Sequence, residues 1–292
     1  MICRSDATTL TIGRLLESGA AYLLRKGLSA EEARTQSEIL ISEILALPSL
    51  QLSFHRDVVP PSESIDRLRS LFHRVGHGEP VQYVIGHWPF HNIELKTDAR
   101  ALIPRPETEV LVERVLASPG WSSAHHILDI GTGTGAIILA LAHAARGTDK
   151  TFTAIDLSPE ALSLARENAS ALGLSIFFIE GNGCAQQPQA SADIIISNPP
   201  YISTADVDAL PPLIRAHEPR LALDGGADGL NLLRQILLDA TQVLRPGGRL
   251  FFEIGDEQGL SLRRLLDCAG YTDVVIAKDF AGHDRYAEGS LP

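Results

Sequence analysis

Strands and helices alternate along the sequence from residue 125 onward, and this alternation constrains the fold more than any other feature. Strands are predicted at 126–130, 151–156, 175–180, 193–197, 249–254, 272–277 and 284–288. Helices are predicted among them at 135–145, 159–172, 229–243 and 257–269. Such alternation is typical of a parallel sheet covered by helices on both faces. Only the short segment 278–283 separates the last two strands, so we expect the last one to run antiparallel to its neighbour.

The beginning of the chain has a different pattern, because its apolar residues recur at helical spacing. Thr8 or Thr9 is expected to cap a first helix, and Ser29 with Glu32 forms a capping box that opens a second. A Pro-Pro-Ser sequence introduces a third helix. Residues 1–77 are therefore predicted to form a small helical domain.

A short region joins the two patterns. Apolar residues alternate from Val81 to Ile85 and again from Phe90 to Leu95, which predicts two short strands. We interpret 78–100 as a β-hairpin linker and 101–292 as the alternating domain. Just inside that domain, the sequence L-I-P-R-P-E-T-E-V-L-V-E predicts the start of a helix, with proline in the first turn and glutamates at its positive end.

Charge and cysteine content exclude several classes of protein. The chain of 292 residues has a formal net charge of −11, and nearly all of it falls in residues 91–292, whose net charge is −10. A protein that holds nucleic acid by its phosphates is usually basic, so stable nucleic-acid binding is not expected. The three cysteines are far apart and form no C-x-x-C pair, which argues against a disulfide framework and a zinc site.

No stretch of 18 apolar residues and no secretory signal is visible, so we expect a cytoplasmic protein without a membrane segment. His73 with His77, and His87 with His91, have a spacing that binds metal on a helix. Glycine and proline interrupt both places, so no metal site is predicted.

The first predicted strand ends in a glycine-rich loop, D-I-G-T-G-T-G-A, over 129–136. Glycine between a strand and a helix allows a sharp turn and a close approach of the backbone to a ligand. The second strand ends in Asp156, where a carboxylate can accept hydrogen bonds from two ribose hydroxyls. These features predict a nucleoside cofactor and leave open whether it is S-adenosylmethionine or NAD. The loop residues that we expect at the cofactor are Gly131, Thr132, Gly133, Thr134 and Gly135.

The fourth predicted strand runs into Asn198-Pro199-Pro200-Tyr201. Two consecutive prolines exclude helix and sheet pairing, and they hold the preceding residue extended. If the first and fourth strands are neighbours, Asn198 lies beside the cofactor. The Asn198 side-chain oxygen and the Pro199 carbonyl could then accept both hydrogens of a planar amino group and orient it for methyl transfer. Tyr201 could stack on that group.

These two motifs together resemble the class I methyltransferases that act on planar amino groups: adenine in DNA, guanine in ribosomal RNA, or glutamine in protein. Further stretches narrow the resemblance. G-E-P-V-Q-Y-V-I-G (78–86), L-I-P-R-P-E-T-E-V-L-V-E (102–113), L-D-I-G-T-G-T-G-A-I (128–137), S-N-P-P-Y-I (197–202) and E-P-R-L-A-L-D-G-G-A-D-G-L (218–230) are similar to the PrmC/HemK family. The resemblance covers essentially the whole chain.

The resemblance implies a Rossmann-like class I methyltransferase with a mostly parallel seven-stranded sheet and a helical substrate-recognition domain. It implies methylation of the glutamine of the Gly-Gly-Gln motif in peptide chain release factors, with S-adenosylmethionine as donor and S-adenosylhomocysteine as product. On this resemblance Asp156 holds the ribose, and residues 198–201 hold the glutamine. The family usually has an aspartate near the adenine where this chain has Asn182, so we expect Asn182 and Gly183 on the adenine side.

Two other functions remain to be weighed. An adenine methyltransferase acting on nucleic acid would use the same Asn-Pro-Pro-Tyr chemistry, but the acidic charge opposes it. An NAD-dependent oxidoreductase or a non-catalytic nucleotide-binding module would give that turn no role. We therefore favour the release-factor substrate and expect a monomer.

Overall fold

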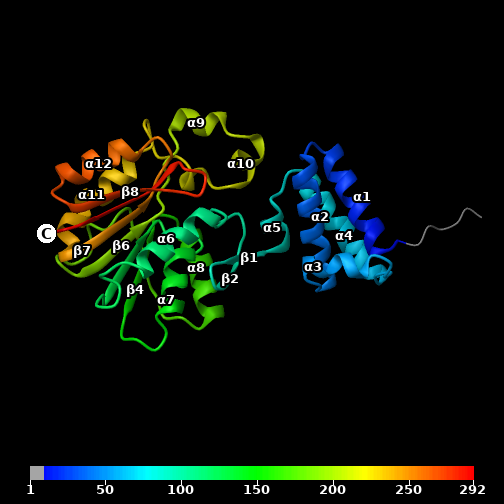
Figure 1. Cartoon of the computed structure of the whole chain (residues 1–292), viewed down its shortest axis with the longest axis horizontal. Helices are drawn as coiled ribbons and strands as arrows, with labels where there is room; N and C mark the ends of the chain where they lie inside the picture. Colours follow the sequence, from blue (N-terminus) through cyan, green and yellow to red (C-terminus); the bar gives the residue numbers. More distant parts are fainter. Residues whose placement is uncertain (1–9) are drawn as a thin grey trace, which may run out of the picture. The chain divides into compact units, whose positions relative to one another are not determined.

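The computed structural model describes residues 10–292, apart from the side chains of residues 212 and 213. The chain divides into two compact units, Met1–Gly86 and His87–Pro292 (Figure 1). Thr8 and Thr9, the expected caps of the first helix, lie outside the described residues, as does Cys3. The first described helix begins at Ile12, and the Thr11 side chain accepts a hydrogen bond from the backbone N–H of Arg14.

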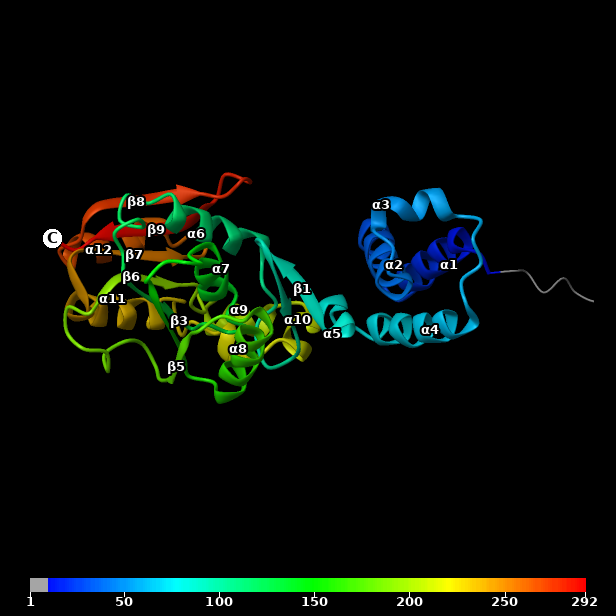
Figure 2. The ribbon, with the colours of Figure 1, turned by 90° about the horizontal axis from the view of Figure 1, so that it is seen from below.

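The first unit is helical, as predicted. Its helices are α1 (Ile12–Arg25), α2 (Ala30–Leu45), α3 (Ser49–Leu52), α4 (Ser62–Gly76) and α5 (Val81–Ile85), with the 3-10 turn η1 (Ser53–His55). The Ser29–Glu32 capping box is confirmed, with both reciprocal hydrogen bonds present. Figure 2 shows α1 to α4 gathered together, and residues such as Leu23, Leu40, Ile41 and Leu68 are buried among them.

The predicted strand at 81–85 is wrong, because this segment is the helix α5. Pro80 precedes it, and Gly86 ends it in the left-handed conformation at φ +83°. Val81 and Val84 are one helical turn apart, and both pack into the core of the first unit. The hairpin exists, but it is formed by β1 (His87–Phe90) and β2 (Ile93–Lys96), which pair antiparallel.

The second unit contains a seven-stranded sheet in the order β5-β4-β3-β6-β7-β9-β8. The strands are β3 (His126–Ile130), β4 (Thr151–Asp156), β5 (Phe177–Glu180), β6 (Ala192–Ser197), β7 (Leu244–Glu253), β8 (Thr272–Lys278) and β9 (Asp284–Ser290). The first five of these are parallel, and β9 runs antiparallel between β7 and β8. The predicted sheet and its antiparallel last strand are confirmed.

Helices cover both faces of this sheet (Figure 1). They are α6 (Pro106–Leu116), α7 (Ala136–Ala144), α8 (Pro159–Leu172), α11 (Asn231–Val243) and α12 (Gly259–Cys268). On one face, Leu111 and Ile138 pack with Ile196. On the other face, Leu237 and Leu262 pack with Ile195. Because β6 is buried on both faces, it is a continuous apolar run, as expected of a central parallel strand.

The condition under which Asn198 would lie beside the cofactor is met, because the first and fourth strands of the domain, β3 and β6, pair with each other. The strand order reverses there, with β4 and β5 on one side and β7 on the other. This point of an open α/β sheet is where ligands bind, beyond the carboxyl ends of the strands. The connection after β6 carries the short helices α9 (Thr204–Ala209), α10 (Pro212–His217) and η2 (Arg220–Ala222).

Within the described residues no single helix is long and apolar enough to cross a membrane. One bent pair, Ala30–Leu45 with Ser49–His55, meets the same criteria of length and composition.

Candidate active site

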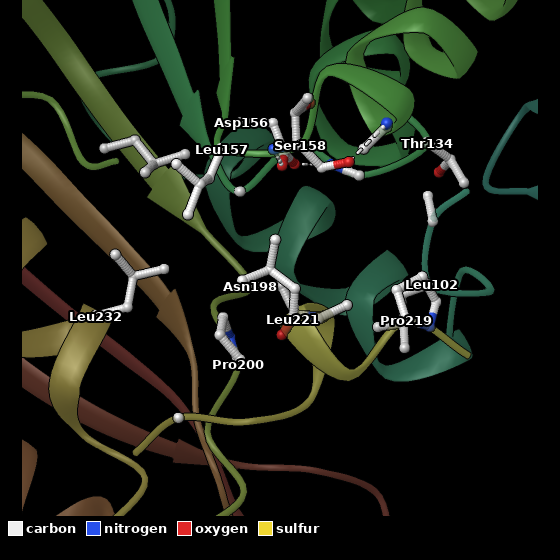
Figure 3. Close-up of a pocket in the computed structure, with 18 of the residues that line it drawn as sticks. Leu102, Thr134, Asp156, Leu157, Ser158, Asn198, Pro200, Pro219, Leu221 and Leu232 are labelled. Atoms are coloured by element: carbon white, nitrogen blue, oxygen red, sulfur yellow. Dashed lines mark hydrogen bonds between the residues drawn. The ribbon is translucent and has the colours of Figure 1, made fainter. Parts of the chain in front are cut away.

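A cavity of about 580 Å³ lies at the carboxyl edge of the sheet, where β3 and β6 end. Its walls come from the segment before α6, the glycine loop, the ends of β4 and β5, the turn after β6 and the loop that leads into α11. Figure 3 shows Asp156 and Leu157 on one side of this cavity, with Asn198, Pro200 and Leu221 on the opposite side. Two sequence motifs more than 60 residues apart therefore face one space.

The glycine loop exposes its backbone to the cavity. Gly131 and Gly133 have φ angles of +71° and +57°, a conformation that side chains rarely adopt. Among the described residues, a Cβ atom placed on Gly131 would meet no atom within 4 Å, and one on Gly133 would meet only the Ala101 side chain at 3.9 Å. The open space beside both residues would let a ligand approach the main chain closely.

Glycine is required at position 135 for packing, not for an approach to the cavity. It does not line the cavity formed by the described residues, although the sequence placed it at the cofactor. Its φ is +84°, and a Cβ atom there would lie 2.8 Å from Leu139 Cδ1 and 3.3 Å from the Ala165 Cβ. Gly135 therefore permits close packing between the start of α7 and α8.

Asp156 connects the end of β4 to the glycine loop. Its carboxylate accepts hydrogen bonds from the backbone N–H of Gly133 at 2.8 Å and of Ser158 at 2.9 Å. Burial raises the pKa of this carboxyl, and these backbone hydrogen bonds oppose the rise. Each carboxylate oxygen has a second lone pair, so Asp156 can still accept from the hydroxyls of a ligand.

A second aspartate near the glycine loop, Asp129 of β3, was not predicted as functional. Asp129 is completely buried, and the Thr132 hydroxyl donates a 2.6 Å hydrogen bond to it. Burial raises the pKa of Asp129 to about 7, and the charge of Asp156 adds to the rise. This hydrogen bond ties the first turn of the glycine loop to the buried strand β3. Thr132 and Thr134 both line the cavity.

Asn182 and Gly183 follow β5 and line the cavity beyond Asp156, together with Gly181. Gly183 has a φ of +82°. The backbone N–H groups of Cys184 and Ala185 donate to the Asp239 carboxylate, which holds this turn against α11.

The turn after β6 is only partly exposed to the cavity. Asn198 and Pro200 line it, whereas Pro199 and Tyr201 are not among its lining residues in the described structure. The Tyr201 ring lies near Gly255, and burial raises the pKa of its hydroxyl to about 12. The Tyr201 carbonyl accepts a hydrogen bond from Gln258, so the segment between β7 and α12 helps to fix this turn.

An ion pair closes the loop after α10 against the start of α6. Arg105 Nη2 donates to both carboxylate oxygens of Glu218, at 2.6 and 2.8 Å, and the Glu218 side chain is only 4% exposed. The two residues of this pair are 113 positions apart along the chain. Pro219 and Leu221 then form one wall of the cavity (Figure 3).

Two residues beside Asn198 were also missed. The Thr108 hydroxyl contacts the Asn198 amide, and it contacts the buried carboxylate of Glu253 on the other side. Thr108 lies within the predicted helix start, and Glu253 is the last residue of an apolar strand, as Asp156 is. Their proximity to Asn198 could not be read from either position alone.

The cavity suits a nucleoside cofactor, because it combines an open glycine backbone, a carboxylate with free lone pairs and an amide side chain at Asn182. Among residues 10–292 no group of three or more His, Cys, Asp or Glu side chains is placed to hold a metal ion. Cys184 is buried and Cys268 is exposed, and both are free thiols.

Family models match both units. Residues 14–86 match the PrmC N-terminal domain, and residues 106–227 match the methyltransferase small domain. Two curated relatives carry the name release factor glutamine methyltransferase. The protein from Geobacter sulfurreducens is 37% identical over 96% of this chain and 97% of its own length. The one from Caulobacter vibrioides is 40% identical over 85% of this chain and 83% of its own length.

Solved structures support the fold at lower identity. The hMettl16 catalytic domain, solved with an RNA hairpin, superposes with a TM-score of 0.52 at 16% identity, over 78% of this chain and 82% of that one. The T. thermophilus 16S rRNA methyltransferase RsmC, solved with AdoMet and guanosine, gives a TM-score of 0.50 at 16% identity, over 70% of this chain and 50% of that one.

Proposed function

The chain belongs to the release factor glutamine methyltransferase family, and on this premise we propose its reaction and its site. It transfers a methyl group from S-adenosylmethionine to the side-chain amide nitrogen of the glutamine in the Gly-Gly-Gln motif of peptide chain release factors. The observation that carries this proposal is that the glycine loop and Asn198 line the same cavity.

The cofactor side of the site is formed by the glycine loop and the two strand ends beyond it. Gly131 and Gly133 offer open backbone, Asp156 accepts from the ribose hydroxyls, and Asn182 with Gly183 lies on the adenine side. When bound, S-adenosylmethionine supplies an electrophilic methyl group and leaves as S-adenosylhomocysteine.

On the substrate side of the site, the group to be methylated is an amide nitrogen, which is a poor nucleophile. The lone pair of a glutamine amide nitrogen is delocalised into its carbonyl group, so orientation matters more than basicity. The Asn198 side-chain oxygen and the Pro199 carbonyl oxygen accept from the two N–H bonds of that nitrogen. They aim it at the methyl group and stabilise the positive charge that develops on it. As the nitrogen–methyl bond forms, the sulfur–methyl bond breaks, and the nitrogen then loses its extra proton to solvent.

We place Tyr201 at the edge of this substrate site and the helical first unit in the recognition of the release factor. Release factors act in translation, so the protein acts in the cytoplasm. Stable nucleic-acid binding is not expected from a second unit with this acidic charge, and a monomeric state stays a prediction.

Incubation of the protein with radiolabelled S-adenosylmethionine and an intact release factor tests the proposal. The factor should become labelled, and a factor whose Gly-Gly-Gln glutamine is changed to alanine should not. Duplex DNA serves as a second substrate. Labelling of the alanine variant at the wild-type level, or of DNA in place of the factor, would overturn the assignment.

A further inference from the structure

The Asn198 amide is the outer end of a hydrogen-bonded chain that runs into the protein core. Asn198 Nδ2 donates to Thr108 Oγ1 at 3.1 Å, and Thr108 Oγ1 donates to Glu253 Oε2 at 2.7 Å. The three residues come from the turn after β6, the first turn of α6 and the end of β7. Thr108 is 4% exposed and Glu253 is 1% exposed, so water does not compete strongly for these contacts.

The chemistry of these groups gives the chain a direction. An ionised carboxylate can only accept hydrogen bonds, and a hydroxyl has a single proton to donate. Because Thr108 donates that proton to Glu253, its oxygen must accept from its other neighbour. The NH₂ end of Asn198 can donate and its oxygen cannot, so the NH₂ end faces Thr108. The amide oxygen is thereby turned away from Thr108.

The direction matters because an amide side chain can flip. The two ends of an asparagine have nearly the same shape, and a rotation of 180° exchanges an acceptor for a donor. In the flipped state, an NH₂ group would face the N–H bonds of the substrate amide, which would repel it.

We propose that Thr108 and Glu253 are positioning residues, which hold the Asn198 amide so that its oxygen faces the glutamine to be methylated. This inference rests on the proposed function and deepens it. Glu253 is not among the described residues that line the cavity, whereas Thr108 lines it beside Asn198. In this role both act through Asn198, by the hydrogen bonds that join the three side chains.

The surroundings of Glu253 make this chain sensitive to pH. Burial raises the pKa of Glu253 to about 7, while hydrogen bonds from Thr108 and Asn198 and the charge of Arg285 on β9 oppose the rise. The charge of Glu107 on α6 adds to the rise, and the hydroxyls of Tyr201 and Tyr286 also lie within its electrostatic range. A protonated Glu253 can donate to Thr108, and Thr108 can then donate to the Asn198 oxygen. The direction of the chain is lost as pH falls.

The test measures single-turnover methylation of an intact release factor at saturating S-adenosylmethionine. Thr108→Val removes the hydroxyl and keeps the shape, and it should lower the rate on the order of tenfold, the effect of one lost hydrogen bond. Thr108→Ser should restore most of the rate. Thr153→Val is the matched control, because Thr153 is equally buried and its hydroxyl is hydrogen-bonded to His126 Nε2 away from the cavity. It should leave the rate unchanged.

A double-mutant cycle separates positioning from a general structural effect. In an Asn198→Ala background, Thr108→Val should cause no further loss, because there is no amide left to orient. The wild-type rate should fall below a pH of about 7, and Glu253→Gln should remove that acidic limb.

Each outcome has a distinct meaning. A folded Thr108→Val variant with the wild-type rate, or an equal loss in both backgrounds, would overturn the positioning role alone. A wild-type protein that does not methylate the release factor would overturn the proposed function, and the positioning role with it.

Discussion

Replacing Asn198 with alanine tests the central residue of the proposed site. The change removes one of two acceptors aimed at the substrate nitrogen, and losing one such preorganised group typically costs two to three orders of magnitude in kcat, or about 2.7–4 kcal/mol. The same substitution should also have a smaller effect on the stability of the fold. Thr108 loses the donor that lies 3.1 Å from its oxygen, which should lower the free energy of unfolding by about 1 kcal/mol.

The two effects are separable because they differ in size and in assay. Single-turnover methylation at saturating cofactor and release factor measures the rate, and thermal unfolding measures the stability. Asn182→Ala is a useful control, because Asn182 is an amide on the cofactor side of the same cavity. It should raise the KM for the cofactor and leave kcat much closer to the wild-type value. A folded Asn198→Ala variant with kcat within about threefold of wild type would refute the reasoning.

Two further predictions concern the cofactor side. Asp156→Ala should weaken S-adenosylmethionine binding by at least tenfold, because a partly buried acceptor is lost together with the hydrogen bonds that it accepts from the Gly133 and Ser158 N–H groups; unchanged affinity by calorimetry would count against the ribose contact. Gly135→Ala should destabilise the protein by roughly 1–3 kcal/mol, because the new Cβ would lie 2.8 Å from Leu139 Cδ1 at a φ of +84°. Gly131→Ala should instead reduce cofactor affinity more than stability, and calorimetry with chemical denaturation would show whether the two glycines differ in this way.

Much of the fold follows from local pattern. The central strands and their helices were predictable because each buries a recognisable apolar face. The strand order was not, because the pairing of β3 with β6 was only a condition until the structure showed it. The segment 81–85 was misread because V-Q-Y-V-I alternates like a strand, while Val81 and Val84 are also one helical turn apart. Only packing into the helical core chose between the two.

The sequence by itself determined the two motifs of the site, because glycine and proline dictate backbone shape wherever they stand. It could not assign Gly135 to packing, pair Arg105 with Glu218, or place Thr108 and Glu253 behind Asn198. Thr108 is 90 residues from Asn198 and 145 from Glu253 along the chain. Contacts of that separation form only when α6 packs over the ends of β6 and β7, so the tertiary structure alone decided which way the Asn198 amide faces.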